Sequence, residues 1–346
     1  MAKKATKSSA AKKASAKKAS AKRGGARSVT NKLLKPSSPK VLSPKVLPGE
    51  LVTLLDLMRY GVSRFVEAGV VFAHGTTDPV AEAAFIVCEV LHLHPDQFEM
   101  FANARVTAHE AMRILALFDK RIATRKPAAY LVNKIYMRGL PFYVDERTIV
   151  PRSFIGELLD SHFGGDLEED GGSLIDDPLN ITRVLDLCTG SGCLAILACQ
   201  SFPNATVDAV DISPDALAVA ARNVADYGVE DRISLYEGDL FDAVNDARYD
   251  LIITNPPYVD AEGMAGLPRE CLHEPSIAFD GGDDGLDIVR RILDRAKDHL
   301  TPDGGLLCEI GRGRDVLGDA YPNLPLLWLD TEDSDGEVFW IPAEAL

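Results

Sequence analysis

Hydrophobic residues recur at every third or fourth position in three stretches between Leu51 and Lys126. The recurring positions are Leu51, Leu54, Leu55 and Met58, then Ala83, Val87, Val90 and Leu91, then Ile114, Leu115, Phe118 and Ile122. This spacing places apolar side chains on one face of an α-helix. Asp78 followed by Pro79 is typical of a helix start, with an N-cap and a first-turn proline. Residues 49–128 are therefore predicted to form a small helical domain.

The pattern changes between residues 129 and 150, where β-branched and aromatic residues gather. Segments 130–137 and 142–150 are predicted to be strands, and the turn-forming segment 138–141 separates them. We expect a β-hairpin that links the helical domain to the rest of the chain.

From Thr182 onward, short apolar stretches alternate with longer helical ones, which is typical of a parallel α/β sheet. Strands are predicted at 184–187, 207–212, 233–235, 251–254, 306–310 and 338–341. Helices are predicted to begin at Cys193 and to span 214–227 and 286–300. Residues 151–346 are thus expected to form one α/β domain.

The composition, 46% hydrophobic and 26% charged, is that of a soluble globular protein. The chain has no long apolar run for a membrane span and no apolar core of a secretory signal. The six cysteines show no C-x-x-C spacing, so neither disulfides nor a zinc site is expected, and a cytoplasmic location fits. His92-x-His94 has no further ligand nearby, so no metal site is predicted.

The net charge of −15 is distributed unevenly. Residues 1–48 hold fourteen of the 37 Lys and Arg residues and none of the 52 Asp and Glu residues, which leaves −29 on the rest. This Ala/Lys/Ser-rich tail is predicted to be disordered. Its charge favours a polyanion, in particular ribosomal RNA, while a solubilising extension and an organellar transit peptide are the alternatives. The acidic, glycine-rich stretch 164–178 is expected to be a surface loop.

The first chemical motif, in residues 184–192, is a buried strand that runs into a glycine-rich turn. Gly190 and Gly192 allow positive φ and let a ligand lie against bare backbone at a helix N-terminus. Such a turn serves NAD, a nucleotide or S-adenosylmethionine, and Ala195 replaces the third glycine of the dinucleotide pattern. An ordinary tight turn is the alternative.

Acidic residues after the next two strands extend this cofactor hypothesis. Asp211 lies about twenty residues beyond the glycines, where a carboxylate can accept both ribose hydroxyls. Asp239 can accept an adenine amino group, and Leu240 beside it offers apolar contact. A capping or loop role is the alternative for Asp211. Gly190 and Asp211 together favour a cofactor that contains adenosine.

Asn255-Pro256-Pro257-Tyr258 follows the predicted strand 251–254 at its carboxyl end, where open α/β sheets bind ligands. An amide nitrogen is a poor nucleophile because its lone pair is delocalised, so a site helps by accepting both N–H hydrogens. The side-chain carbonyl of Asn255 and the main-chain carbonyl of Pro256 can do this. The two prolines stiffen the turn, and Tyr258 can stack on a flat acceptor. A chance proline-rich loop is the alternative.

These motifs resemble those of class I methyltransferases that modify amide or exocyclic amino nitrogens. Three subclasses share them: adenine-N6 nucleic-acid methyltransferases, release-factor glutamine methyltransferases, and the HemK-like glutamine methyltransferases of ribosomal protein L-three. The segments that resemble the third subclass are 142–147, 150–153, 155–158, 186–193, 207–220, 255–261, 273–275 and 284–286. The resemblance covers roughly residues 51–342. Phe154 departs from it, because that family usually has proline at this position.

The resemblance implies a Rossmann-like class I fold: an α/β domain with a mostly parallel seven-stranded sheet, preceded by a small helical domain and a β-hairpin. It implies methyl transfer from S-adenosylmethionine to a glutamine side-chain nitrogen of ribosomal protein L-three, which the helical domain would recognise. The implied cofactor-binding residues are Asp186, Thr189, Gly190, Gly192, Asp211, Ile212, Asp239, Leu240 and Asn255, and the implied catalytic residues are Asn255, Pro256, Pro257 and Tyr258. Arg152 and Glu274 are candidate contacts of the substrate or of the residues that hold it, with structural roles as the alternative.

The other two subclasses remain alternatives, as does a binding protein without enzymatic activity. Nucleic acid is disfavoured because a body of charge −29 is a poor surface for a duplex and no recognition module follows the core.

Overall fold

The computed structural model describes residues 49–163, 174–175, 177–332 and 334–346. The basic tail and most of the acidic stretch 164–178 therefore lie outside the described residues. By its internal contacts the chain divides into Met1–Leu42 and Ser43–Leu346, and all the described residues belong to the second unit. Within the described part of the chain, no helix is both long and apolar enough to cross a membrane.

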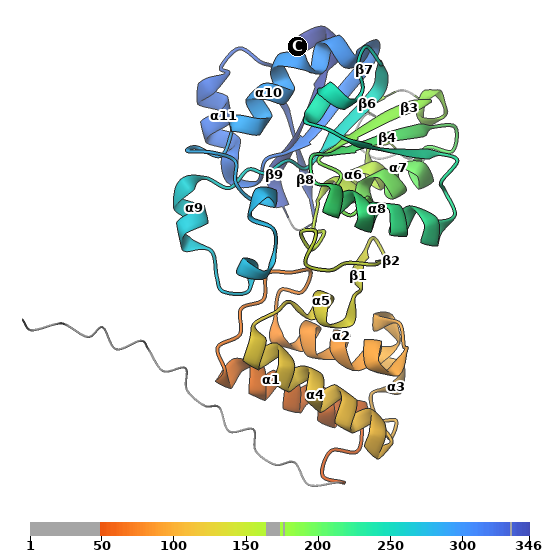
Figure 1. Cartoon of the computed structure of the whole chain (residues 1–346), viewed down its shortest axis with the longest axis vertical. Coiled ribbons are helices and arrows are strands. Elements are labelled where there is room, and N and C mark those ends of the chain that lie inside the picture. Colours follow the sequence, from red (N-terminus) through yellow and green to blue (C-terminus); the bar gives the residue numbers. More distant parts are fainter. Residues whose placement is uncertain (1–48, 164–173, 176, 333) are drawn as a thin grey trace, which may run out of the picture. The chain divides into compact units, whose positions relative to one another are not determined.

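Three amphipathic helices come first along the described chain (Figure 1), and we call them the helical bundle. They are α1 (Leu54–Glu67), α2 (Pro79–Leu91) and α4 (Ala108–Thr124), with the short η1 (Pro95–Gln97) and α3 (Phe98–Phe101) between the last two. Each of the three begins at a residue whose side chain accepts hydrogen bonds from first-turn N–H groups: Thr53, Asp78 and Thr107. The predicted helix start at Asp78 and Pro79 is confirmed.

The core of the bundle is made by aromatic and aliphatic side chains that the helical spacing brings to one face. The rings of Phe65 and Phe118 meet edge to face, with centroids 5.3 Å apart. Gly61 allows this approach of α1 and α4, because a Cβ there would lie 2.6 Å from the Phe118 ring. Ile86 and Ile114 are fully buried beside them.

A buried ion pair joins α2 to α4. The Arg121 side chain is fully buried, and it donates to Glu82 at 2.7 Å and to the main-chain oxygen of Val71 at 2.9 Å. Its guanidinium also lies 3.8 Å from the buried Glu270, in the second half of the chain. Because buried charges are tolerated only when paired, this cluster fixes where the segment around Glu270 meets the bundle.

A β-hairpin follows the short helix α5 (Ala128–Val132). Its strands, β1 (Ile135–Met137) and β2 (Leu140–Phe142), are antiparallel. They are joined by Arg138 and Gly139, both with positive φ, as a two-residue hairpin turn requires. The predicted hairpin exists, but the predicted strands were too long.

Each end of the predicted hairpin adopts another structure. Tyr130 belongs to α5 and not to a strand. Beyond Phe142 the chain runs without a partner strand, because side chains satisfy its backbone. The N–H of Tyr143 donates to Asn223, and Asn133 donates to the oxygen of Val144. Backbone that is paired in this way needs no sheet.

Seven strands of the described chain form one sheet, in the order β5-β4-β3-β6-β7-β9-β8. They are β3 (Arg183–Leu187), β4 (Thr206–Asp211), β5 (Ile233–Glu237), β6 (Tyr249–Thr254), β7 (Leu300–Glu309), β8 (Leu327–Thr331) and β9 (Ser334–Pro342). All neighbours pair in parallel except those of β9, which is antiparallel to β7 and β8. The expected Rossmann-like, mostly parallel seven-stranded sheet is confirmed. The edge strand β8 was not among the predicted ranges.

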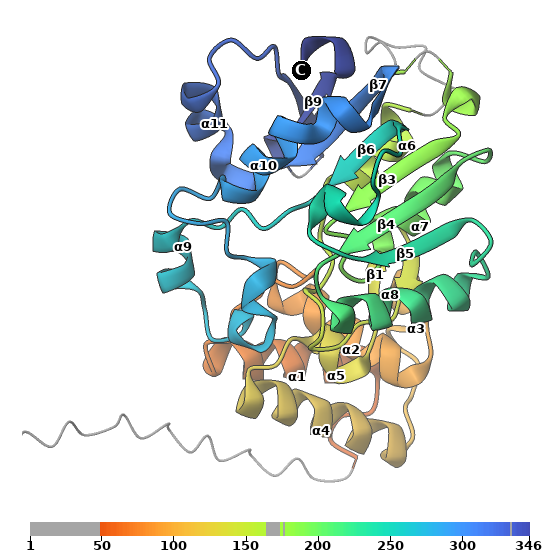
Figure 2. The same cartoon turned by 45° about the horizontal axis from the view of Figure 1, so that its top comes forward.

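Helices cover both faces of this sheet (Figure 2). One face packs against α6 (Ile155–Ser161), α7 (Cys193–Ser201) and α8 (Pro214–Tyr227), and the other against α10 (Asp287–Ala296) and α11 (Arg314–Ala320). The predicted helix start at Cys193 and the predicted span of α8 are confirmed. The helix predicted at 286–300 is shorter, because the chain tightens into the 3-10 turn Lys297–His299 and Leu300 already begins β7.

The strand order reverses beside β3, because β4 and β5 extend the sheet on one side and β6 and β7 on the other. Leu187 and Thr254 are register partners at the carboxyl ends of β3 and β6. The loops that begin at Cys188 and Asn255 therefore start side by side. Open α/β sheets bind ligands at such a switch point.

The buried ion pair of the bundle gives a first prediction. Replacing Arg121 by alanine leaves the carboxylate of Glu82 buried without its main partner and removes one of the two guanidinium groups beside the buried Glu270. We expect the free energy of unfolding to fall by about 3–5 kcal/mol, measured by urea denaturation followed by circular dichroism.

Arg113→Ala is the matched control, because Arg113 is exposed on the same helix. It should change the free energy of unfolding by less than about 0.5 kcal/mol. Equal losses in the two variants would contradict a special role for the buried pair.

Candidate active site

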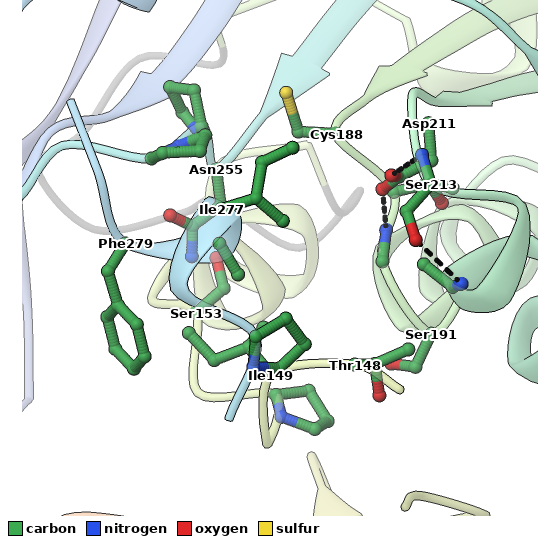
Figure 3. Close-up of a pocket in the computed structure, with 18 of the residues that line it drawn as sticks. Thr148, Ile149, Ser153, Cys188, Ser191, Asp211, Ser213, Asn255, Ile277 and Phe279 are labelled. Carbon is green, nitrogen blue, oxygen red and sulfur yellow. Dashed lines mark hydrogen bonds between the residues drawn. The ribbon is translucent and has the colours of Figure 1, made fainter. Parts of the chain in front are cut away.

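A chamber of about 540 Å³ opens at the carboxyl ends of the parallel strands (Figure 3). Its lining comes from the loops after β3, β4, β5 and β6 and from two segments outside the sheet, 147–153 and 267–280. In Figure 3, Asp211 and Asn255 lie on opposite sides of the view, with Cys188 and Ile277 between them. The chamber therefore brings together the two groups of residues that the sequence predicted separately.

The glycine-rich turn forms one side of the chamber. Gly190 has a φ of +57°, and a Cβ there would project into open space with no atom within 4 Å. Gly192, also at positive φ, serves a different contact, because a Cβ there would meet the Cβ of Ala220 on α8 at 3.2 Å. Thr189 and Gly190 line the chamber, whereas Gly192 lies behind it. The turn thus presents bare main chain to a ligand.

Asp211, at the end of β4, holds this turn in place. Its two oxygens accept hydrogen bonds from the N–H of Gly190 at 2.8 Å and of Ser213 at 2.9 Å. Burial raises the pKa of this carboxyl group, while these backbone hydrogen bonds lower it. Each oxygen keeps a second lone pair for a ligand hydroxyl. Beside it, Ile212 lines the chamber with half of its surface exposed, which is the position of an apolar ligand contact.

Asp186 is fully buried behind the turn and does not line the chamber. The hydroxyl of Thr189 donates to it at 2.5 Å. Burial raises the pKa of its carboxyl group to about 7. The structure therefore places Asp186, like Gly192, where it shapes the turn, and direct contact of either with a cofactor stays a prediction.

The third predicted cofactor element lies after β5. Asp239 and Leu240 both line the chamber, and Leu240 is held at a positive φ of 53°. Arg291 of α10 forms an ion pair with Asp239 at 2.8 Å and lines the chamber too. Arg291 was not predicted, because nothing near it in the sequence indicates that α10 reaches this loop.

Cys188 lies between the two sides of the chamber (Figure 3). Burial raises the pKa of its thiol far above the ordinary value, and the carboxylates of Asp211 and Asp186 raise it further. All six cysteines are free.

The four residues Asn255, Pro256, Pro257 and Tyr258 form the other side and all line the chamber. The side-chain nitrogen of Asn255 donates to Glu309 at 3.0 Å, and the hydroxyl of Tyr258 donates to the same carboxylate oxygen at 3.2 Å. Because the nitrogen of this amide is engaged, its oxygen is the group that can accept an N–H from a substrate. This is the orientation that the proposed chemistry of Asn255 requires.

Glu309 is the central residue of this side and was missed by the sequence analysis. Its other oxygen accepts hydrogen bonds from the hydroxyl of Ser153 at 2.7 Å and the N–H of Phe154 at 2.9 Å. The side chain is fully buried, and burial raises its pKa to about 7. The sequence signal for it is weak, because an acidic residue near the end of a predicted strand does not by itself indicate a site.

The two candidate substrate contacts are placed differently. Arg152 lines the chamber, whereas Glu274 is buried behind it. Glu274 accepts hydrogen bonds from Arg152 at 3.2 and 3.5 Å, from the N–H of Val150 at 2.9 Å, and pairs with His74 at 2.9 Å. Glu274 does not line the chamber, so its direct contact with a substrate stays a prediction.

One group of described residues has the spacing of metal ligands, and it includes Glu274. The ligand atoms of His74, Cys271 and Glu274 lie within 4.8 Å of one another, and all three side chains are buried. Both oxygens of Glu274 are already engaged, and the Arg152 cation beside them disfavours a second cation. We therefore treat the group as a hydrogen-bonded contact between the bundle and the segment 267–280.

The chain is similar to methyltransferases over most of its length. The family model of the methyltransferase small domain matches residues 173–267. A ribosomal protein uL3 glutamine methyltransferase of Bradyrhizobium diazoefficiens is 74% identical over 298 residues, which cover 86% of this chain and 93% of that protein. Proteins of the same name from Bordetella pertussis and Burkholderia pseudomallei are each 50% identical, and both matches cover 86% of this chain and 97% of the relative.

The buried carboxylate of Glu309 gives a prediction about pH. A proton taken up as the pH falls through about 7 turns one oxygen from an acceptor into a donor, so that it can no longer accept from all its partners. We expect kcat for methyl transfer at saturating cofactor to fall below this pH. Glu309→Gln should lower kcat by about tenfold at pH 8 and remove this dependence.

Burial also raises the pKa of Asp186 to about 7. Protonation of Asp186 should lower the affinity for the cofactor, so measuring kcat at saturating cofactor isolates the effect of Glu309. A Glu309→Gln variant that keeps the wild-type pH profile would show that another group titrates.

Proposed function

Since the chain belongs to the family of ribosomal protein uL3 glutamine methyltransferases, we propose that it methylates a glutamine side-chain nitrogen of ribosomal protein uL3, that is, L-three. The methyl donor is S-adenosylmethionine. The identity of 74% across most of both chains is the observation that carries the substrate assignment. The arrangement of Asn255 against Glu309 is the structural feature that fits an amide acceptor.

The glycine-rich side of the chamber fits this cofactor. S-adenosylmethionine supplies a methyl group made electrophilic by its sulfonium. The residues that would hold it are Thr189, Gly190, Asp211, Ile212, Asp239 and Leu240, all of which line the chamber. The open space in front of Gly190 lets the ligand contact the main chain. The Asp211 carboxylate supplies a polar contact, and the exposed Ile212 side chain supplies an apolar one.

The other side of the chamber is suited to hold an amide nitrogen. The side-chain oxygen of Asn255 and the main-chain oxygen of Pro256 would accept the two N–H hydrogens, and Tyr258 would stack on the amide plane. Held in this way, the nitrogen is placed in line with the methyl group, so catalysis rests on position and electrostatics. As the new C–N bond forms, the methyl–sulfur bond would break and a neutral thioether would leave. The nitrogen would then give its extra proton to water, so no general base is required before transfer.

We assign substrate recognition to the helical bundle and the segment 267–280. This segment lines the chamber, and the contacts of Glu270 and Glu274 join it to the connection between α1 and α2. The N–H of Val71 donates to Glu270 at 3.2 Å, and His74 pairs with Glu274. A protein bound to the bundle would therefore lie close to the chamber. A cytoplasmic site of action follows from a ribosomal protein as substrate.

The basic residues 1–48 are proposed to bind ribosomal RNA. The segment has fourteen Lys and Arg residues and no acidic residue, so its charges can replace the counterions of a phosphate backbone. Such binding would raise the local concentration of assembling ribosomes around the enzyme.

The proposed reaction is tested by methyl transfer from labelled cofactor to purified uL3, to ribosomes from cells that lack the enzyme, and in parallel to release factor and DNA. Label should enter uL3, and mass spectrometry should place it on one glutamine. Asn255→Ala should lower the rate by at least about a hundredfold, because it removes the group that orients the amide.

Asn204→Ala is the control for this variant, since Asn204 is exposed and lies away from the chamber lining. It should transfer methyl groups at the wild-type rate. Label on release factor or DNA instead of uL3 would keep the chemistry and refute the substrate assignment. Comparing free uL3 with assembling particles shows which one is the preferred substrate.

The role of the tail is tested by deleting residues 1–48 and measuring co-sedimentation with ribosomes. We expect the deletion to abolish co-sedimentation at low salt and to leave kcat on free uL3 unchanged. The full-length protein should lose co-sedimentation as salt rises, because counterion release drives the binding. Unchanged co-sedimentation after the deletion would overturn the proposal.

A further inference from the structure

The segment 150–154 lies between two buried carboxylates, Glu274 and Glu309. It enters the chamber lining directly after the irregular stretch that follows β2 and ends where α6 begins. Neither carboxylate is close to it in the sequence: Val150 and Glu274 are 124 positions apart, and Ser153 and Glu309 are 156 positions apart. The segment is therefore held by long-range contacts at both of its ends.

Glu274 holds the first half of the segment. One oxygen accepts the N–H of Val150 at 2.9 Å and the guanidinium of Arg152 at 3.2 Å. The other pairs with His74 at 2.9 Å. The Arg152 side chain is fixed further by the ring of Phe279, whose centroid lies 5.7 Å away and which lines the chamber.

Glu309 holds the second half and carries the contact on to the acceptor side. One of its oxygens accepts from Ser153 and from the N–H of Phe154, and the other from Asn255 and Tyr258. A continuous series of polar contacts thus runs from His74 through Glu274, the segment 150–154 and Glu309 to the side chain of Asn255.

The far end of this series belongs to the helical bundle side of the molecule. His74 lies in the connection between α1 and α2, and its side chain is buried. A second glutamate of the 267–280 segment, Glu270, is fixed nearby by Arg125 at 3.4 Å and by the N–H of Val71. The bundle and the chamber wall are therefore joined by paired, buried groups.

We propose that Glu274 is a positioning residue for the methyl acceptor: it fixes the segment 150–154, and through Glu309 it fixes the orientation of the Asn255 amide. The inference rests on the proposed function, since it concerns the same acceptor. It goes beyond it in assigning a role to a residue that does not line the chamber. It also gives the bundle a route by which bound protein can influence turnover.

Removing the charge of Glu274 tests the series of contacts. In Glu274→Gln one acceptor oxygen becomes an NH2 group that faces donors, so the segment 150–154 loses part of its anchor. We expect kcat on uL3 to fall by about tenfold, the size of one charge-assisted hydrogen bond, while the Kd of the cofactor changes by less than about twofold. If Glu274 had only a structural role, its substitution would lower thermal stability and would not reduce kcat selectively while leaving cofactor binding unchanged.

A double-mutant cycle with Ser153→Ala decides whether Glu274 acts through the segment 150–154. Ser153→Ala removes one donor to Glu309 and should also lower kcat. If both residues act through the same segment, the double variant should lose little more than the worse single variant. Effects on kcat that multiply would overturn the proposal, because independent residues contribute independently.

Asp208→Asn is the matched control. Asp208 of β4 is another largely buried carboxylate and does not line the chamber; it accepts from Tyr249 at 2.8 Å and pairs with Arg183 at 2.9 Å, and neither partner belongs to the series. This variant should keep the wild-type kcat. A loss equal to that of Glu274→Gln would refute the specific role.

If Glu274→Gln does not fold, His74 variants replace it, because they remove only one of the contacts. His74→Ala should lower kcat, and His74→Gln, which restores an N–H donor, should recover part of it. Equal activity of the two would overturn the proposal. Wild-type protein that does not methylate uL3 at all would refute the proposed function, whereas active wild type with multiplying effects refutes only the role of Glu274.

Discussion

The burial of the Glu309 carboxylate is the constraint on which the acceptor side of the chamber depends. Moving a carboxylate out of water costs several kcal/mol unless hydrogen bonds replace the lost solvent. Here the replacement comes from Ser153, the N–H of Phe154, Asn255 and Tyr258. Because every donor must be in place to offset the desolvation, the four groups become fixed relative to one another. A planar, weakly nucleophilic amide needs such a fixed partner.

The two sides of the chamber are built in different ways. The cofactor side consists of loops that directly follow neighbouring parallel strands, and its main contact joins Gly190 in the loop after β3 to Asp211 at the end of β4. The acceptor side is assembled from parts of the chain that are far apart, with Glu309 at the end of β7 and Ser153 before α6. The cofactor side follows from the order of the strands, whereas the acceptor side forms only when the whole domain is folded.

This difference explains what could be predicted from the sequence. The helix α8 was placed correctly because Ser213, Pro214 and the left-handed Gly228 mark its ends locally. The strand β8 was not predicted because it is an edge strand that depends on its pairing with β9. The predicted hairpin was too long because the backbone beyond it hydrogen-bonds to the side chain of Asn223 instead of to a partner strand. Asn255 and Asp211 belong to motifs that can be recognised in the sequence. Glu309 and Arg291 belong to no such motif, because their roles come from contacts between distant parts of the chain.

The half-buried thiol of Cys188, which lines the chamber, has a consequence for the chemistry there. A thiolate is a far better nucleophile than an amide nitrogen, so an ionised cysteine between the two sides would compete for the methyl group. Burial and the nearby carboxylates of Asp211 and Asp186 raise the pKa of this thiol, so it stays protonated. The acidic residues that hold the turn thereby also suppress self-alkylation, and a chamber open to a reactive sulfonium can contain a cysteine without being inactivated by it.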